Sequence, residues 1–441
     1  MKTRINRRQF IKAAGLGAAV LAAPGCLDAA GQFSGNNTGK KPNIILIMAD
    51  DIGYECFGCY GSKSYKTPVL DELAQTGVRF EHCYSQPLCT PSRVKIMTGQ
   101  YNFRNYVNFG VLDPKQKTFG HMLRNRGYAT CVVGKWQLYG SVNQGTQVRG
   151  TGSLPEQAGF DEHCLWQVKE RGLRYKNPLM IQNGKRRDDL QGKYGPDVSC
   201  DYALDFIERH KTGPFLVYFP MALVHSPFVP TPDSEDWDKP KHKNNTKYFA
   251  DMVAYMDKIV GRIVSRLDEL GLRENTLLLF TGDNGTHKSI KSKMQDGIIQ
   301  GDKGNTTDAG TRVPLIANQP GVIRSRKVCG DLVDFSDFVP TIAEAAGIEV
   351  PGNIKVDGRS FLPQLRGEKG NPREWIFCYY DPKWLGRKKA TRFVRDKRWK
   401  LYAGGDLYDV PADTLEKNPN PPGPEAAEAR KRLQAVLDSM K

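Results

Sequence analysis

The chain has 441 residues, of which 39% are hydrophobic and 25% are charged, and this balance excludes a disordered, collagen-like or low-complexity protein. A chain of this length can bury a large core. Lys and Arg number 64 against 48 Asp and Glu, a formal net charge of +16 that favours anionic partners. Because neither a basic stripe with interleaved aromatic residues nor a zinc-finger spacing accompanies the charge, we do not expect nucleic acid as a partner.

The first thirty residues have the features of a bacterial export signal. Arg7-Arg8-Gln9-Phe10-Ile11-Lys12 precedes a small, weakly apolar run over residues 13–25 that is too short to cross a bilayer. This segment resembles a twin-arginine signal and predicts export by the twin-arginine machinery to the periplasm or cell surface. Cys26 could carry a lipid anchor, with ordinary signal cleavage as the alternative. Residues 31–40 are predicted to be a linker.

From Lys41 onward, short apolar runs alternate with amphipathic segments. Five runs are predicted to be buried strands, at residues 43–49, 128–133, 215–219, 276–281 and 313–317. Helices are predicted after Thr67 and over residues 118–126, 197–210 and 247–270. The alternation predicts an α/β fold with a large, mostly parallel sheet and helices on both faces. All apolar runs are too short for a transmembrane helix, so none is expected.

Polar side chains follow four of these predicted strands directly. They are Asp50-Asp51, Lys135, His225 and Asp283-Asn284. Ligands bind beyond the carboxyl ends of the strands in such sheets, so we expect these side chains to lie together. Three carboxylates and an amide oxygen suit a hard divalent cation, Ca²⁺ or Mg²⁺, and without one the carboxylates would repel one another.

The segment Cys89-Thr-Pro-Ser-Arg-Val-Lys-Ile-Met-Thr-Gly-Gln100 closely resembles the signature of the formylglycine-dependent (type I) sulfatases of the alkaline phosphatase superfamily. The resemblance runs from Pro42 to about Arg366. Other strings of the family pattern occur in order along the chain: Asp50-Asp51-Ile-Gly-Tyr, Gly134-Lys135-Trp136, His225-Ser-Pro-Phe, Thr281-Gly-Asp283-Asn284-Gly, Lys303 ahead of Gly310-Thr-Arg-Val-Pro, and Asp337-Phe-Val-Pro-Thr341. The resemblance implies an alkaline phosphatase-like fold. It also implies an exported enzyme that hydrolyses a sulfate ester of a carbohydrate or an aryl alcohol.

The resemblance also assigns roles to single residues. Cys89 would be oxidised by a formylglycine-generating or radical maturation enzyme to formylglycine, whose gem-diol is the nucleophile. Asp50, Asp51, Asp283 and Asn284 would hold the cation, which the family pattern makes Ca²⁺ rather than Mg²⁺. The remaining roles are charge stabilisation by Arg93, sulfate binding by Lys135 and Lys303, and protonation of the leaving oxygen by His225.

One position departs from the family pattern, which usually reads Gly-Lys-Trp-His where this chain has Gly134-Lys135-Trp136-Gln137. Glutamine can hydrogen-bond to the formylglycine but cannot accept its proton at neutral pH. Either Gln137 suffices for positioning, another base substitutes, or turnover is slow. His287 is the nearest substitute along the chain, and a loop histidine facing solvent or substrate is the alternative.

The chain changes character after the catalytic part, which we predict over residues 41–366. Residues 375–380 and 391–401 alternate like strands, and a charged helix is predicted from about Pro424. Residues 367–441 therefore resemble the small C-terminal antiparallel α+β subdomain of sulfatases.

Two other functions remain open from the sequence. A phosphonate or phosphate-ester hydrolase of the same superfamily can share the modified cysteine and the metal ligands. Alternatively, Gln137 and the basic balance would also suit a catalytically impaired protein that binds sulfated glycans at the cell surface.

Overall fold

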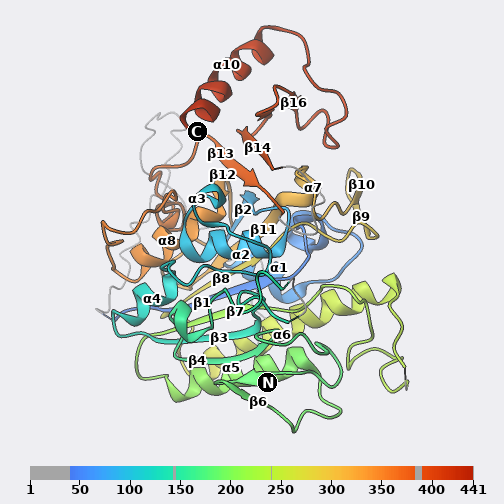
Figure 1. The fold of residues 1–441 in the computed structure, drawn as a ribbon, viewed down its shortest axis with the longest axis vertical. Helices are drawn as coiled ribbons and strands as arrows, with labels where there is room; N and C mark the ends of the chain where they lie inside the picture. The colour runs from blue at the N-terminus through green and yellow to red at the C-terminus, as the bar shows by residue number, and fades with distance from the viewer. Residues whose placement is uncertain (1–39, 143–145, 240, 383–389, 441) are drawn as a thin grey trace, which may run out of the picture. The chain divides into compact units, whose positions relative to one another are not determined.

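A ten-stranded sheet forms the centre of the computed structural model, which describes residues 40–142, 146–239, 241–382 and 390–440 (Figure 1). The strand order is β12-β2-β11-β8-β1-β7-β3-β4-β5-β6. Strands β8, β1, β7, β3 and β4 are parallel to one another, whereas β11 and β5 are antiparallel to the strands beside them. The prediction of a mostly parallel sheet is therefore confirmed.

The bounds of the sheet strands follow the buried apolar runs of the sequence. They are β1 (Asn43–Ala49), β2 (Val78–Tyr84), β3 (Ala129–Lys135), β4 (Glu162–Trp166), β5 (Ile181–Gln182), β6 (Lys185–Arg186), β7 (Phe215–Pro220), β8 (Thr276–Gly282), β11 (Arg312–Asn318) and β12 (Lys327–Asp334). A separate hairpin consists of β9 (Lys291–Met294) and β10 (Gly297–Gln300).

Helices cover both faces of the sheet, as predicted. The longer ones are α1 (Pro68–Gln75), α2 (Cys89–Thr98), α4 (Phe119–Arg124), α5 (Gly195–Arg209), α6 (Phe249–Glu269) and α8 (Phe338–Ala345), and the short ones are α3 (Asn102–Asn105), α7 (Asp308–Thr311) and α9 (Leu362–Arg366). Alternate residues of β1 belong to two separate hydrophobic cores, Ile45 and Ile47 on one face and Ile44 and Leu46 on the other. Apolar residues of α1, α5 and α6 fill the first core, and those of α2, α4 and α8 fill the second.

The C-terminal part forms a four-stranded antiparallel sheet of β13 (Ile376–Tyr380), β14 (Thr391–Arg395), β15 (Trp399–Tyr402) and β16 (Leu407–Asp409), followed by α10 (Pro424–Ser439). Figure 1 shows it in orange and red beside β12 and α7. The single run predicted over residues 391–401 is two strands, because the chain reverses at residues 396–398. The predicted antiparallel α+β subdomain is otherwise confirmed.

The twin-arginine segment, Cys26 and almost all of the predicted linker lie outside the described residues. Within the described ranges, no helix combines the length and apolar character needed to cross a membrane.

Candidate active site

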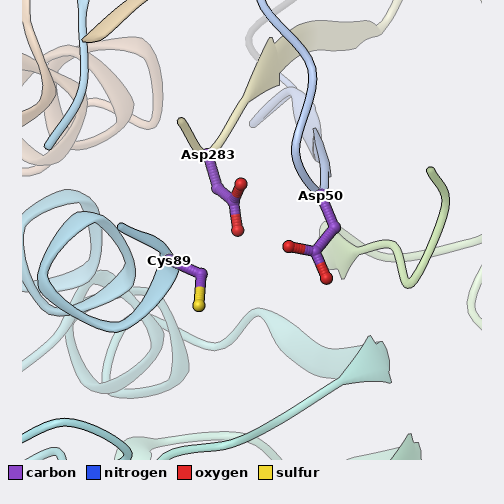
Figure 2. Close-up of side chains that lie close together, drawn as sticks. All are labelled: Asp50, Cys89 and Asp283. Carbon is purple, nitrogen blue, oxygen red and sulfur yellow. The ribbon is translucent and has the colours of Figure 1, made fainter. Parts of the chain in front are cut away.

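Two carboxylates meet because their strands are neighbours. Asp50 follows β1 and Asp283 follows β8, and these parallel strands pair as far as Ala49 and Gly282. One atom each of Asp50, Asp283 and Cys89 lies within 4.8 Å of the other two. Figure 2 shows both carboxylates turned toward a common space, with Cys89 on α2 beside it. The predicted juxtaposition of strand ends is what the fold produces.

Asp51 and Asn284 complete this group. The Asp51 backbone N–H donates to Asp283 Oδ1 at 3.0 Å, and Asn284 Nδ2 donates to Asp51 Oδ1 at 3.0 Å. Asp51 has a left-handed backbone with φ of 60°, which bends the chain sharply after β1 and sends its carboxylate to the same space as that of Asp50. The side chains of Asp50, Asp51, Asp283 and Asn284 are all fully buried.

The donor set fits a divalent metal ion. Asp50 Oδ1 and Asn284 Oδ1 are buried oxygens with no hydrogen-bond partner among the described groups. A buried acceptor without a partner is costly, and a cation would satisfy both oxygens while offsetting the repulsion between the three carboxylates. Asp50, Asp51, Asp283 and Asn284 are therefore the residues that would hold such an ion.

Three cations surround the carboxylates. Lys135 Nζ lies 2.7 Å from Asp50 Oδ2, Lys303 Nζ lies 2.6 Å from Asp51 Oδ2, and Arg93 Nη2 lies 3.1 Å from Asp283 Oδ2. Lys135 and Arg93 are 1% exposed, so these pairs are shielded from water. The predicted sulfate-binding and charge-stabilising residues thus lie within one cluster with the predicted metal ligands.

The surrounding charges lower the pKa of two of the carboxylates and leave that of the third raised. Burial alone would raise the pKa of Asp50, but Lys135, His225 and Arg93 hold this pKa well below its usual range. In the same way, His225 and Lys303 outweigh burial and lower the pKa of Asp51. Burial and the negative charge of Asp50 instead raise the pKa of Asp283 to about 7. A bound cation would favour the ionised form of Asp283.

Cys89 is the first residue of α2, beside the positive end of that helix. Its side chain is 2% exposed, and its Sγ donates to Gln137 Oε1 at 3.3 Å. Burial raises the pKa of the Cys89 thiol, so the unmodified residue is a poor nucleophile at neutral pH. The helix N-terminus nevertheless suits an anionic substrate arriving at this residue. Gln137, which stands where the family pattern has histidine, is therefore in direct contact with Cys89.

His225 lies at the rim of the site, in the loop after β7. Its Nε2 is 3.6 Å from Asp51 Oδ2, while its Nδ1 is 2.5 Å from the carbonyl oxygen of Ser226. Burial lowers the pKa of His225 to about 3, and Asp51 opposes this shift. The bond to Ser226 makes Nδ1 the protonated nitrogen of neutral His225. Proton donation from Nε2 would therefore require the imidazolium form.

His287 contacts Ser289 and Phe228. Its Nδ1 is 2.9 Å from Ser289 Oγ, and its ring packs against Phe228 with centroids 5.6 Å apart. Burial lowers the pKa of His287, with Asp51 and Lys303 within electrostatic reach. A role for His287 as the substitute base stays a prediction.

Sequence reasoning missed two residues next to His225. The Tyr175 hydroxyl donates to the carbonyl oxygens of Ala222, at 3.0 Å, and of His225, and so fixes the loop that carries the histidine. Arg174, 7% exposed, stacks on Trp166 with its guanidinium carbon 4.2 Å from the ring centroid. Both residues lie in the basic stretch between β4 and β5, where nothing in the sequence distinguishes them from their neighbours.

The chain is similar to known sulfatases. The family model described as "Sulfatase" matches residues 42–348, and the model described as "N-sulphoglucosamine sulphohydrolase, C-terminal" matches residues 301–441. Human arylsulfatase A is 30% identical, over 85% of this chain and 78% of that protein. The N-acetylgalactosamine-6-O-sulfatase of Bacteroides thetaiotaomicron is 28% identical, over 95% of this chain and 96% of its own.

Solved structures share the architecture. The crystal structure of Ps i-CgsB in complex with k-i-k-neocarrahexaose has a TM-score of 0.75 and 25% identity, covering 91% of this chain and 93% of that one. The phosphonate monoester hydrolase of Agrobacterium radiobacter has a TM-score of 0.69, over 90% of this chain and 95% of its own, but only 20% identity, so its likeness extends to the fold alone.

Proposed function

The chain belongs to the sulfatase family and is a sulfuric ester hydrolase, and from this premise we propose that it removes sulfate from a sulfated carbohydrate by means of formylglycine at position 89. The observation that carries the proposal is the position of Cys89, at the N-terminus of α2 and within 4.8 Å of Asp50 and Asp283. A carbohydrate substrate is supported by the similarity to the Bacteroides N-acetylgalactosamine-6-O-sulfatase, which extends over 95% of this chain.

Ca²⁺ is the ion we propose for Asp50, Asp51, Asp283 and Asn284, because carboxylate and amide oxygens are the ligands that Ca²⁺ takes in proteins. The ion would supply positive charge that polarises a sulfate oxygen, and formylglycine would supply a hydrated aldehyde as nucleophile.

The chain's own cations would bind the ester sulfate. Lys135 and Lys303 each lie beside a carboxylate and can turn a second N–H toward an anion, since an ammonium has three donors. Arg93 donates to Asp283 and to the carbonyl oxygen of Lys135 at 3.0 Å, and both bonds fix its guanidinium next to Cys89. Such fixed charges stabilise the growing negative charge of the transition state without rearrangement.

The leaving oxygen needs a proton, and His225 is the residue we propose to deliver it. The negative charge of a bound sulfate ester favours the imidazolium form that Nε2 requires for this step. Tyr175 would hold the His225 loop in place while the proton moves. Gln137 would orient the modified residue 89, in which oxygen takes the place of the sulfur that Gln137 contacts here.

The calcium assignment predicts that Asp283→Ala lowers Ca²⁺ affinity by more than about 100-fold, beyond the loss typical of changes around a metal site's outer ligands. The measurement is a calcium titration by calorimetry, which does not depend on turnover. Asp257→Asn is the matched control, because Asp257 is also a buried carboxylate but accepts N–H bonds from Val69 and Leu70 of α1. Unchanged calcium affinity in Asp283→Ala would refute the assignment.

The function itself is tested by comparing how fast the protein hydrolyses different classes of ester. Protein produced with a maturation enzyme is assayed on an aryl sulfate, an aryl phosphonate monoester and a panel of sulfated mono- and disaccharides. We expect sulfate release with the highest kcat/KM on one sulfated sugar. Faster hydrolysis of the phosphonate would favour a phosphonate or phosphate-ester hydrolase. Binding of sulfated sugars without release of sulfate would favour a catalytically impaired glycan-binding protein.

We further propose export by the twin-arginine machinery to the periplasm or cell surface. The support is the segment Arg7–Lys12 and the apolar run that follows it. Cys26, directly after that run, is the candidate attachment site for a lipid anchor.

A further inference from the structure

The loop that carries Lys303 has no regular structure of its own. Residues 303–307, between β10 and α7, form neither helix nor strand. Yet Lys303 has to hold its ammonium 2.6 Å from Asp51, at the end of a flexible four-carbon side chain. The position of this ammonium therefore depends on what fixes the backbone of the loop.

The C-terminal sheet supplies several of these contacts. The Tyr380 hydroxyl, on β13, donates to the carbonyl oxygen of Gly304 at 3.2 Å. Two residues of β15 hold Thr306: Lys400 Nζ donates to its carbonyl oxygen, and the Tyr402 hydroxyl lies 2.8 Å from its Oγ1. Lys400 and Tyr402 are two positions apart on one strand, so both side chains point from the same face of the small sheet.

Lys400 is a buried cation whose partners define one geometry. Its side chain is 0% exposed, and its Nζ forms an ion pair of 2.6 Å with Glu416 Oε1. Glu416 Oε2 also accepts from the Tyr402 hydroxyl at 2.5 Å. A buried charge is tolerated only when it is paired and hydrogen-bonded, so displacement of Thr306 would cost Lys400 one of its partners.

We propose that Lys400, Tyr402 and Glu416 are positioning residues that set the location of Lys303 and thereby the affinity of the site for the substrate sulfate. The inference rests on the proposed role of Lys303 in binding that sulfate. It gives the C-terminal sheet a role in substrate binding. The sheet would act through its contacts with the loop that carries Lys303.

The test uses full-length Lys400→Met and Tyr402→Phe variants, alone and combined with Lys303→Ala. Arg398→Met is the matched control, because Arg398 precedes β15 directly and pairs with Asp409 and Glu425 of the same C-terminal part rather than with the Lys303 loop. Measured quantities are KM and kcat on an aryl sulfate, the dissociation constant for inorganic sulfate by calorimetry, and the melting temperature.

We expect Lys400→Met to raise KM and the sulfate dissociation constant, with a loss in kcat/KM on the order of 10- to 100-fold, because small displacements of a binding group have effects of this size. Tyr402→Phe should cause a smaller loss of the same kind. In the Lys303→Ala background both changes should have little further effect, since they act through Lys303. Arg398→Met should leave KM and sulfate affinity unchanged.

Two results would overturn the inference. One is a Lys303→Ala enzyme that is impaired while Lys400→Met and Tyr402→Phe keep normal KM and sulfate affinity. The other is additive losses in the double variants, which would mean that Lys400 and Tyr402 act independently of Lys303. If Lys400→Met does not fold, Tyr402→Phe decides the question, because it removes only a hydroxyl. Full activity in Lys303→Ala alone would instead refute the proposed role of Lys303.

Discussion

At the scale of single residues, Gln137 sets this chain apart from the sulfatase pattern. Its Oε1 accepts from the Cys89 sulfur, and its backbone has a left-handed φ of 55°. The amide can orient the modified residue 89 but cannot remove a proton from it at neutral pH. Histidine tolerates left-handed backbone better than most residues, so the position can accept an imidazole without rebuilding the loop.

We therefore predict that Gln137→Ala lowers kcat about tenfold, and that Gln137→His equals or exceeds the native rate. General-base catalysis contributes roughly 10²–10⁴ in rate, so an added imidazole is visible wherever proton removal limits turnover. The measurements are initial rates and single-turnover sulfate release, with the calcium titration as a control for an intact metal site. A Gln137→Ala enzyme with native kcat would contradict a positioning role.

From the strand pattern alone it was possible to predict that Asp50, Asp283 and Lys135 lie together, because they stand at the carboxyl ends of the parallel strands β1, β8 and β3 of one sheet. The strand pattern could not predict the role of Tyr175. The contact of its hydroxyl with the His225 loop joins residues 50 positions apart and follows from loop packing rather than from any local pattern.

At the scale of elements, Glu162 joins β4 to α5. Its carboxylate accepts from Arg209 Nη2 at 2.7 Å and from the Tyr202 hydroxyl at 2.7 Å, both on α5. The hydrogen bonds from Arg209 are the largest cause that lowers the pKa of Glu162 to about 2, from 4.5. The ionised carboxylate thus stabilises the contact between this strand and the helix that packs beside it.

The lowered pKa predicts a pH-dependent contribution to stability. A carboxyl whose pKa falls on folding stabilises the native state above its unfolded pKa, and this contribution is lost as the pH falls toward the folded value. We expect Glu162→Gln to be less stable than the native chain at pH 6, with the difference shrinking from about pH 4.5 toward pH 2. Urea denaturation of both proteins across this range gives the measurement, and a difference independent of pH would exclude the mechanism.

Strand prediction succeeded where strands are buried on both faces and failed where polar residues interrupt them. β1 is a continuous apolar run after its first residue and begins and ends where predicted. β2 reads Val-Arg-Phe-Glu-His-Cys-Tyr and β12 reads Lys-Val-Cys-Gly-Asp-Leu-Val-Asp, and neither was predicted. β12 is the edge strand and β2 lies beside it, and the polar residues Arg79, Glu81 and His82 of β2 are only half-buried.

At the scale of the whole molecule, the described residues between 40 and 440 belong to one compact unit that includes the C-terminal sheet. A buried ion pair and a buried hydrogen bond cross the predicted boundary at residue 366. Arg373 contacts Asp337, with both side chains less than 5% exposed, and Lys95 on α2 donates to Asp334 at 2.6 Å and to the carbonyl oxygen of Phe377 on β13 at 3.2 Å. The small sheet is therefore anchored to the helix that begins with Cys89. The boundary itself stays a prediction.

The measurement that tests the central claim most directly relates sulfate release to the chemical state of Cys89. Protein batches with different degrees of maturation are digested, and the fraction of the residue-89 peptide that is about 18 Da lighter than the thiol form is determined by mass spectrometry. We predict that the initial rate of sulfate release rises in proportion to this fraction and extrapolates to zero when no residue 89 is modified. Undiminished sulfate release by protein in which Cys89 is entirely a thiol would contradict the account.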